Sequence, residues 1–75
     1  MVTIYSTNTC TYCVMAKEYF REHNVEFIEK NVQEDKEAMK EMVEKTHQLG
    51  VPVIDIDGTI ILGFDRGAIE KALGK

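Results

Sequence analysis

The first thirty residues contain a strand pattern, a helix pattern and a second strand pattern, and this close spacing constrains the fold more than any other feature of the chain. Residues 2–6 alternate β-branched and aromatic side chains before a polar turn. Residues 11–23 repeat apolar side chains at helical spacing, and a strand pattern follows at residues 25–29. A helix that joins two strands over so short a length makes the strands parallel, with a right-handed crossover. We therefore expect an α/β fold.

The remaining residues predict a second helix, a β-hairpin and a third helix. Residues 34–49 place their apolar side chains on one helical face, and Gly50 is expected to end this helix. An Asp-Gly turn joins two strands that we expect at residues 51–56 and 59–62. Asp65 is a candidate N-cap for the last helix. The element order βαβ-α-ββ-α predicts an α/β sandwich of at most three layers.

The composition is that of a single globular domain covering residues 1–75. Hydrophobic residues make up 44% of the chain and charged residues 29%, and so short a chain supports one domain. The net charge is -4 without a cluster of basic and aromatic residues, so we expect no nucleic-acid partner. No apolar stretch approaches the roughly 18 residues of a membrane span, and the first residues lack the basic and then apolar pattern of a secretion signal. We therefore expect no membrane partner and a cytoplasmic location.

Cys10 and Cys13 are the two cysteines of the chain, and they lie where the first strand pattern gives way to the first helix pattern. Structural disulfides do not persist in a reducing cytosol, and a bond between residues so close together would stabilise the fold little. A C-x-x-C motif within a βαβ unit indicates redox chemistry. At the helix start, free N–H groups and the helix dipole favour the thiolate of Cys10, the expected nucleophile. Cys13, one turn further in, is expected to be the resolving thiol.

A metal site is the main alternative use of the two thiols. Zinc takes four ligands in structural sites, and His23 and His47 are the histidines that the chain offers. Neither histidine has a partner at ligand spacing. We interpret His23 as a helix-end residue and His47 as a solvent-facing one, and we expect no metal.

The chain resembles the glutaredoxin family, including bacterial glutaredoxin-like redoxins, over essentially its whole length. The matching segments, in order, are Tyr5-Ser6, Thr9-Cys10-Thr11-Tyr12-Cys13, Ala16-Lys17, Gly50-Val51-Pro52 and Gly63-Phe64-Asp65. The resemblance implies a thioredoxin fold, in which three helices flank a four-stranded mixed sheet. It also implies a dithiol oxidoreductase that reduces protein disulfides or glutathione mixed disulfides. Glutathione would be the reductant, and no cofactor would be tightly bound.

The resemblance assigns roles to residues beyond the cysteines. The family's proline follows a cis peptide bond, and the backbone before it pairs with the bound thiol like an added strand, so we expect a cis Val51–Pro52 bond facing Cys10. A trans proline that opens a strand is the alternative. Asp65 and the start of the last helix correspond to the position that holds the γ-glutamyl end of glutathione. The substrate-binding set implied by the family is Tyr12, Val51, Pro52, Gly63, Phe64 and Asp65.

Several departures from the family pattern remove positive charge near the thiols. Thr7 stands where many members have lysine or arginine, Thr11 replaces a frequent proline, and Val14-Met15 replaces a typically basic pair. Gly63-Phe64 also replaces a glycine pair. We expect weaker glutathione binding and a less depressed pKa for Cys10. These losses move the interpretation towards redoxins that thioredoxin reductase recharges and that serve ribonucleotide reductase, although the tyrosine between the cysteines is kept.

Donor, clients and assembly are expectations by family analogy. The electron donor would be glutathione or thioredoxin reductase, and the clients would include ribonucleotide reductase, methionine sulfoxide reductase or a peroxidase. We expect a monomer. Two other classes stay open: a module that binds an iron–sulfur cluster between two subunits through Cys10 and glutathione, and a docking domain on a thioredoxin-like scaffold.

Overall fold

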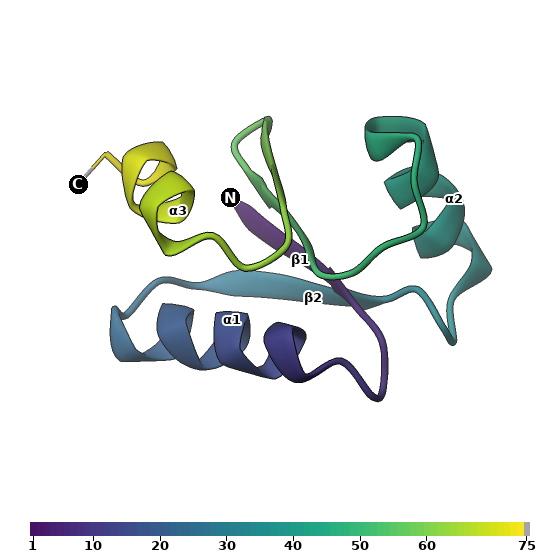
Figure 1. Ribbon diagram of the computed structural model, residues 1–75, viewed down its shortest axis with the longest axis horizontal. Helices are drawn as coiled ribbons and strands as arrows, with labels where there is room; N and C mark the ends of the chain where they lie inside the picture. The colour runs from purple at the N-terminus through teal and green to yellow at the C-terminus, as the bar shows by residue number, and fades with distance from the viewer. Residues whose placement is uncertain (75) are drawn as a thin grey trace.

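The computed structural model describes residues 1–74, whose elements follow the predicted order (Figure 1). The elements are β1 (Val2–Ser6), α1 (Thr11–Glu22), β2 (Phe27–Asn31), α2 (Lys36–Thr46), β3 (Val53–Ile56), β4 (Thr59–Leu62) and α3 (Arg66–Ala72). Within residues 1–74, no helix has the length and apolar character needed to cross a bilayer. The βαβ-α-ββ-α prediction is therefore confirmed.

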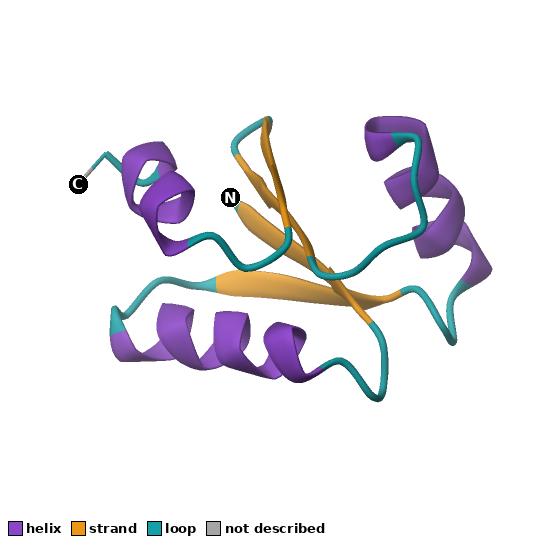
Figure 2. Ribbon diagram, in the orientation of Figure 1, coloured by secondary structure: helices purple, strands orange, loops and turns teal. Residues whose placement is uncertain are grey.

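The four strands form one mixed sheet in the order β2-β1-β3-β4 (Figure 2). Strand β1 runs parallel to β2 and antiparallel to β3, and β4 runs antiparallel to β3. The carboxyl ends of β1, β2 and β4 and the amino end of β3 therefore share one edge of the sheet. The loops that follow or precede these ends carry the predicted site residues.

Each face of the sheet supports its own core. Ile4, Phe20 and Ile69 belong to a core in which α1 and α3 cover one face, whereas Tyr5 and Met42 belong to a core in which α2 covers the other. Neighbouring residues of β1 thus enter opposite cores, as the two-residue period of a strand requires. The three-layer arrangement places α1 and α3 on the same side, opposite α2 (Figure 1).

Helix α2 is shorter than the sequence pattern predicted. Asp35 caps its start by accepting hydrogen bonds from two backbone N–H groups, and the helix ends at Thr46. His47 then adopts the left-handed conformation with a φ of 58°, so the prediction that Gly50 ends the helix was wrong. Glycine is the usual residue for such a stop, but polar residues also adopt this conformation. Leu49 consequently lies beyond the helix and is 69% exposed.

The strands also begin later than predicted. Strand β3 begins at Val53, because Pro52 has no N–H group to donate to a ladder. Strand β2 begins at Phe27, because Asn24 and Val25 still belong to the turn that ends α1. Asn24 has a φ of 56°, and the N–H of Val25 donates to a carbonyl oxygen of α1 at 2.8 Å. Asparagine adopts this left-handed conformation more readily than most residues, which suits Asn24 to the end of α1.

Candidate active site

The two cysteines lie at the start of α1, at the sheet edge where β1 ends. Cys10 is the N-cap of α1, and its Sγ accepts a hydrogen bond from the backbone N–H of Cys13 at 3.1 Å. The two sulfurs are bonded, and the Cα atoms are 5.2 Å apart, a normal separation for a disulfide. Cys10 is half-buried, whereas Cys13 is 1% exposed. The pair can therefore exchange between dithiol and disulfide with only Cys10 open to an incoming disulfide.

A clasp of side-chain hydrogen bonds fixes the loop that carries Cys10. Asn31 Nδ2 donates to Asn8 Oδ1 at 2.6 Å, and the backbone N–H of Asn8 donates to Gln33 Oε1 at 3.1 Å. Asn31 Oδ1 also accepts from the N–H groups of Gln33 and Glu34, which begin the turn into α2. The partners are about two dozen residues apart in sequence. Sequence reasoning missed this clasp because no local sequence pattern predicts contacts between residues so far apart.

The Val51–Pro52 peptide bond is cis, as predicted, and the trans alternative was wrong. Val53, the next residue, pairs with Tyr5 on β1. The backbone oxygen of Pro52 accepts a hydrogen bond from Gly63 N–H at 2.9 Å. Pro52 therefore lies at the shared sheet edge, between the end of β1 that leads to Cys10 and the end of β4.

Gly63, Phe64 and Asp65 connect β4 to α3 at the same edge. Gly63 has a φ of 80°, a conformation that favours glycine. Phe64 is half-buried and packs against the core beneath α1 and α3. Asp65 is exposed and caps α3, because its Oδ1 accepts a hydrogen bond from Ala68 N–H at 3.1 Å. The predicted N-cap is thus confirmed, while a role of Asp65 in binding a ligand stays a prediction.

The exposed side chains next to the thiols at the start of α1 are uncharged. Tyr12 is 61% exposed, and Val14 and Met15 are also exposed. Thr7, in the loop before Cys10, carries no charge either. The rim formed by Tyr12, Val14 and Met15 is therefore apolar, and it is open to contact with another protein.

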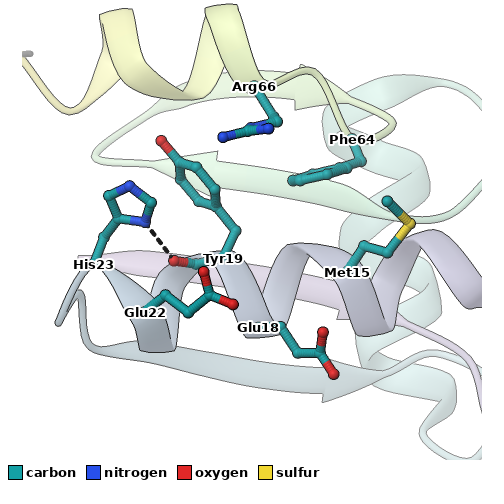
Figure 3. Close-up of a pocket in the computed structure, with 7 residues that line it drawn as sticks. All are labelled: Met15, Glu18, Tyr19, Glu22, His23, Phe64 and Arg66. Carbon is teal, nitrogen blue, oxygen red and sulfur yellow. Dashed lines mark hydrogen bonds between the residues drawn. The ribbon is translucent and has the colours of Figure 1, made fainter.

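A groove of about 230 Å³ lies between α1 and the start of α3 (Figure 3). Its lining residues are Met15, Glu18, Tyr19, Glu22, His23, Phe64 and Arg66. The His23 ring stacks on Tyr19 with centroids 4.1 Å apart, and Arg66 Cζ lies 5.5 Å from the centroid of the Tyr19 ring on its other flank. Burial, with help from Glu70, raises the pKa of Tyr19. Sequence reasoning missed the groove, although its α1 wall repeats at helical spacing.

The histidines occupy the positions that the sequence indicated. His23 is the C-cap of α1, and its Nδ1 lies 2.8 Å from the backbone oxygen of Tyr19 (Figure 3). His47 is exposed at the end of α2. Among residues 1–74, no group of three or more histidine, cysteine or acidic side chains is arranged to hold a metal ion.

The fold and the cysteine pair together define a thiol–disulfide oxidoreductase of the thioredoxin fold. The glutaredoxin family model matches residues 2–61, and the chain belongs to the glutaredoxin family. This membership agrees with the resemblance seen in the sequence.

Three known proteins are similar to the chain over almost its whole length. An uncharacterized glutaredoxin-like 8.6 kDa protein in the rubredoxin operon of Clostridium pasteurianum is 45% identical over 100% of both chains. The glutaredoxin-like protein NrdH of Lactococcus lactis is 35% identical, covering 95% of this chain and 97% of its own. The crystal structure of a thioredoxin-like protein matches with a TM-score of 0.90 and 25% identity, covering 96% of this chain and 99% of that one.

Proposed function

We propose that the protein reduces disulfides in client proteins by a dithiol mechanism in which Cys10 attacks and Cys13 resolves. The observation that carries this proposal is the contrast between the two thiols. Cys10 is accessible at the N-cap of α1, and Cys13 is buried one turn later, within bonding distance. Only the Cys10 thiol can react with a client disulfide, and the Cys13 thiol can react only with Cys10.

The electrons balance over two exchange steps. The Cys10 thiolate attacks one sulfur of the client disulfide, and the other client sulfur leaves as a thiolate and takes up a proton. The Cys13 thiolate then attacks Cys10, which forms the Cys10–Cys13 disulfide and releases the second client thiol. The client gains two electrons, and a donor returns them to the protein. The N–H of Cys13, which donates to Cys10 Sγ, stabilises the attacking thiolate of Cys10.

The surface around the thiols supports a protein client. The exposed rim of Tyr12, Val14 and Met15 offers apolar contact area. The backbone of Val51 precedes β3 at the same sheet edge, where an extended segment of the client could pair as an added strand. Ribonucleotide reductase is the client class that we propose first, on the basis of the similarity to the NrdH proteins.

Two donors remain as candidates, and different observations support each. Thioredoxin reductase is supported by the similarity to NrdH and by uncharged residues at Thr7, Val14 and Met15, where a glutathione carboxylate would need cations. Glutathione is supported by Asp65 at the start of α3, the position that corresponds to its γ-glutamyl site in the family. We propose thioredoxin reductase as the principal donor and glutathione as the weaker one.

The test is a turnover assay with the donor varied. Purified protein is given a disulfide-containing protein substrate and NADPH, with either thioredoxin reductase or glutathione plus glutathione reductase. We expect faster turnover with thioredoxin reductase, and loss of turnover with both donors in Cys10→Ser. The matched Cys13→Ser variant should lose dithiol turnover but still form a mixed disulfide. Equal turnover by wild type and Cys10→Ser would refute the proposed chemistry, and faster turnover with glutathione would refute the donor assignment.

We place this activity in the cytoplasm and assign it to a monomer. A reductase of disulfides needs a donor pool that keeps its own dithiol reduced, which the cytosol provides. In a monomer, both thiols of the mechanism come from one α1, so no second chain is needed for either step.

A further inference from the structure

Lys17 lies on α1 one helical turn after Cys13 and is paired with a carboxylate on the sheet. Lys17 Nζ donates to Glu29 Oε2 at 2.7 Å, and the hydroxyl of Ser6 donates to the same oxygen at 2.7 Å. Ser6 is fully buried, and the Lys17 side chain is 19% exposed. The ion pair therefore lies at the margin of the interface between α1 and the sheet, and solvent screens it only in part.

The strand register places the ion pair on the face of the sheet that α1 covers. Glu29 is the ladder partner of Ile4, which belongs to the core beneath α1. Paired residues on neighbouring strands point to the same face, and so do residues two apart on one strand. Glu29 and Ser6 therefore face α1. Cys13 is one of the buried residues of that helix.

The hydrogen bonds also fix the direction of the Lys17 side chain. Ser6 ends β1, so its bond holds the Glu29 carboxylate towards the sheet edge at which α1 begins. Helical side chains lean towards the helix N-terminus, and Cβ atoms four residues apart are about 6 Å apart. Both effects direct the Lys17 side chain towards the N-terminal part of α1, where Cys13 lies one helical turn before it.

We infer that Lys17 is a positioning residue for the resolving step: fixed by Glu29 and Ser6, its ammonium group stabilises the Cys13 thiolate during attack on the mixed disulfide at Cys10. This inference rests on the proposed dithiol mechanism. Burial disfavours the ionised form of a thiol, and Cys13 is 1% exposed, so a nearby cation would favour its thiolate.

The remaining charges near this interface do not take the same role. The hydrogen bond from Lys17, followed by the one from Ser6, lowers the pKa of Glu29, so its carboxylate is a poor base for the Cys13 proton. Arg21 also acts on Glu29, but it lies one turn further from Cys13 along α1. Asp65 and Arg66 begin α3, which contacts β4 at the opposite edge of the sheet from β2.

Stopped-flow exchange with an equimolar aromatic disulfide, whose released thiolate is coloured, separates the two steps. Attack by Cys10 releases one aromatic thiolate and leaves the other half bound to Cys10. Attack by Cys13 then forms the Cys10–Cys13 bond and releases the second thiolate, so the slower phase measures the resolving step. Release of a single equivalent by wild type would refute the proposed mechanism itself, independently of Lys17.

Three variants test the role of Lys17 in the second phase. Lys17→Met should slow it at neutral pH and shift its pH profile upwards. The thiolate fraction of Cys13 falls about tenfold for each pKa unit gained, and the greater nucleophilicity of the more basic thiolate offsets part of this loss in rate. Lys17→Arg should restore the rate. Glu29→Gln keeps an amide oxygen that can accept from Lys17 and Ser6 but removes the opposing negative charge, so it should shift the profile downwards. Lys40→Met, an exposed lysine of α2, is the matched control and should leave both phases unchanged.

The opposite signs of the two shifts distinguish an electrostatic role from a merely structural one. If the ion pair only stabilised the packing of α1 on the sheet, both Lys17→Met and Glu29→Gln would slow the second phase. That result, or a second phase in Lys17→Met equal to wild type at every pH, would overturn the inference. If Lys17→Met fails to fold, the direction of the shift in Glu29→Gln still decides the question.

Discussion

Tyr5 holds a network of charges between α2 and the sheet, and replacing it with phenylalanine would open that network. Its hydroxyl donates to Glu41 Oε1 at 2.5 Å and accepts from Lys45 Nζ at 2.8 Å. Lys45 also donates to Asp55 at 2.8 Å, and Lys30 donates to Glu41 at 2.9 Å. The ring itself is fully buried, so phenylalanine keeps the packing and removes only the hydroxyl.

The expected cost follows from these contacts. A hydrogen bond to a charged group contributes about 1.5–3 kcal/mol when well shielded. Glu41 and Lys45 are 39% and 34% exposed, so water replaces part of the lost bonds and the lower end of the range applies. We expect Tyr5→Phe to lose about 1–2 kcal/mol of unfolding free energy, which lowers the urea midpoint by about 1 M for a domain of this size.

The pH dependence of the loss has a definite sign. The hydrogen bond from Tyr5, followed by that from Lys30, lowers the pKa of Glu41 from 4.5 to about 2. A carboxylate with a depressed pKa contributes stability that is present above its unfolded pKa and disappears as pH falls through its folded pKa. The difference between wild type and Tyr5→Phe should therefore be full near neutral pH and shrink between about pH 4.5 and 2.

Urea unfolding followed by circular dichroism at several pH values measures this loss. Tyr12→Phe is the matched control, because the Tyr12 side chain is largely exposed and its loss of a hydroxyl should leave stability unchanged. Equal unfolding free energies for wild type and Tyr5→Phe at neutral pH would refute the reasoning. A difference that stays constant down to pH 2 would refute the role assigned to Glu41.

Substitutions at three further positions test the loops of the site by urea unfolding. Asn31→Ala removes the hydrogen bond to Asn8 and should lower the unfolding free energy by about 1–2 kcal/mol. It should also slow the attack of Cys10, and an unchanged rate would show that the clasp does not position this loop. Asp65→Ala removes the N-cap of α3 and should lower the unfolding free energy by about 1 kcal/mol. Asp65→Asn keeps a capping oxygen and should retain most of this stability. Gly63→Ala should lower the unfolding free energy by about 1 kcal/mol, because the positive φ at this position is unfavourable for alanine. An unchanged unfolding free energy would contradict this expectation.

Most of the fold could be predicted from the sequence because its signals are local. The βαβ unit, the Asp-Gly hairpin and the cap at Asp65 each depend on residues within one turn or one strand. The cysteine motif is equally local, since four consecutive residues determine its position at a helix start. The cis Val51–Pro52 bond came from the family resemblance, because a single X-Pro pair does not by itself distinguish cis from trans.

The contacts that the sequence did not predict join residues far apart in the chain. The Asn8–Asn31 clasp and the Lys17–Glu29 pair depend on the register of β1 with β2, which no short pattern specifies. The network around Tyr5 likewise depends on how α2 lies across the sheet. The end of α2 was predicted wrongly for a different reason, because the glycine rule favoured Gly50 over His47.

Trapping the mixed disulfide shows which thiol attacks and which one resolves. Reduced Cys13→Ser protein is mixed with a peptide that contains one disulfide, and the intact mass and its proteolytic fragments are measured. We expect a stable adduct that maps to Cys10, and wild type under the same conditions should release the reduced peptide and carry the Cys10–Cys13 disulfide. An adduct on Cys13 in the reciprocal Cys10→Ser variant, formed at a comparable rate, would contradict the role of Cys10 as the attacking thiol.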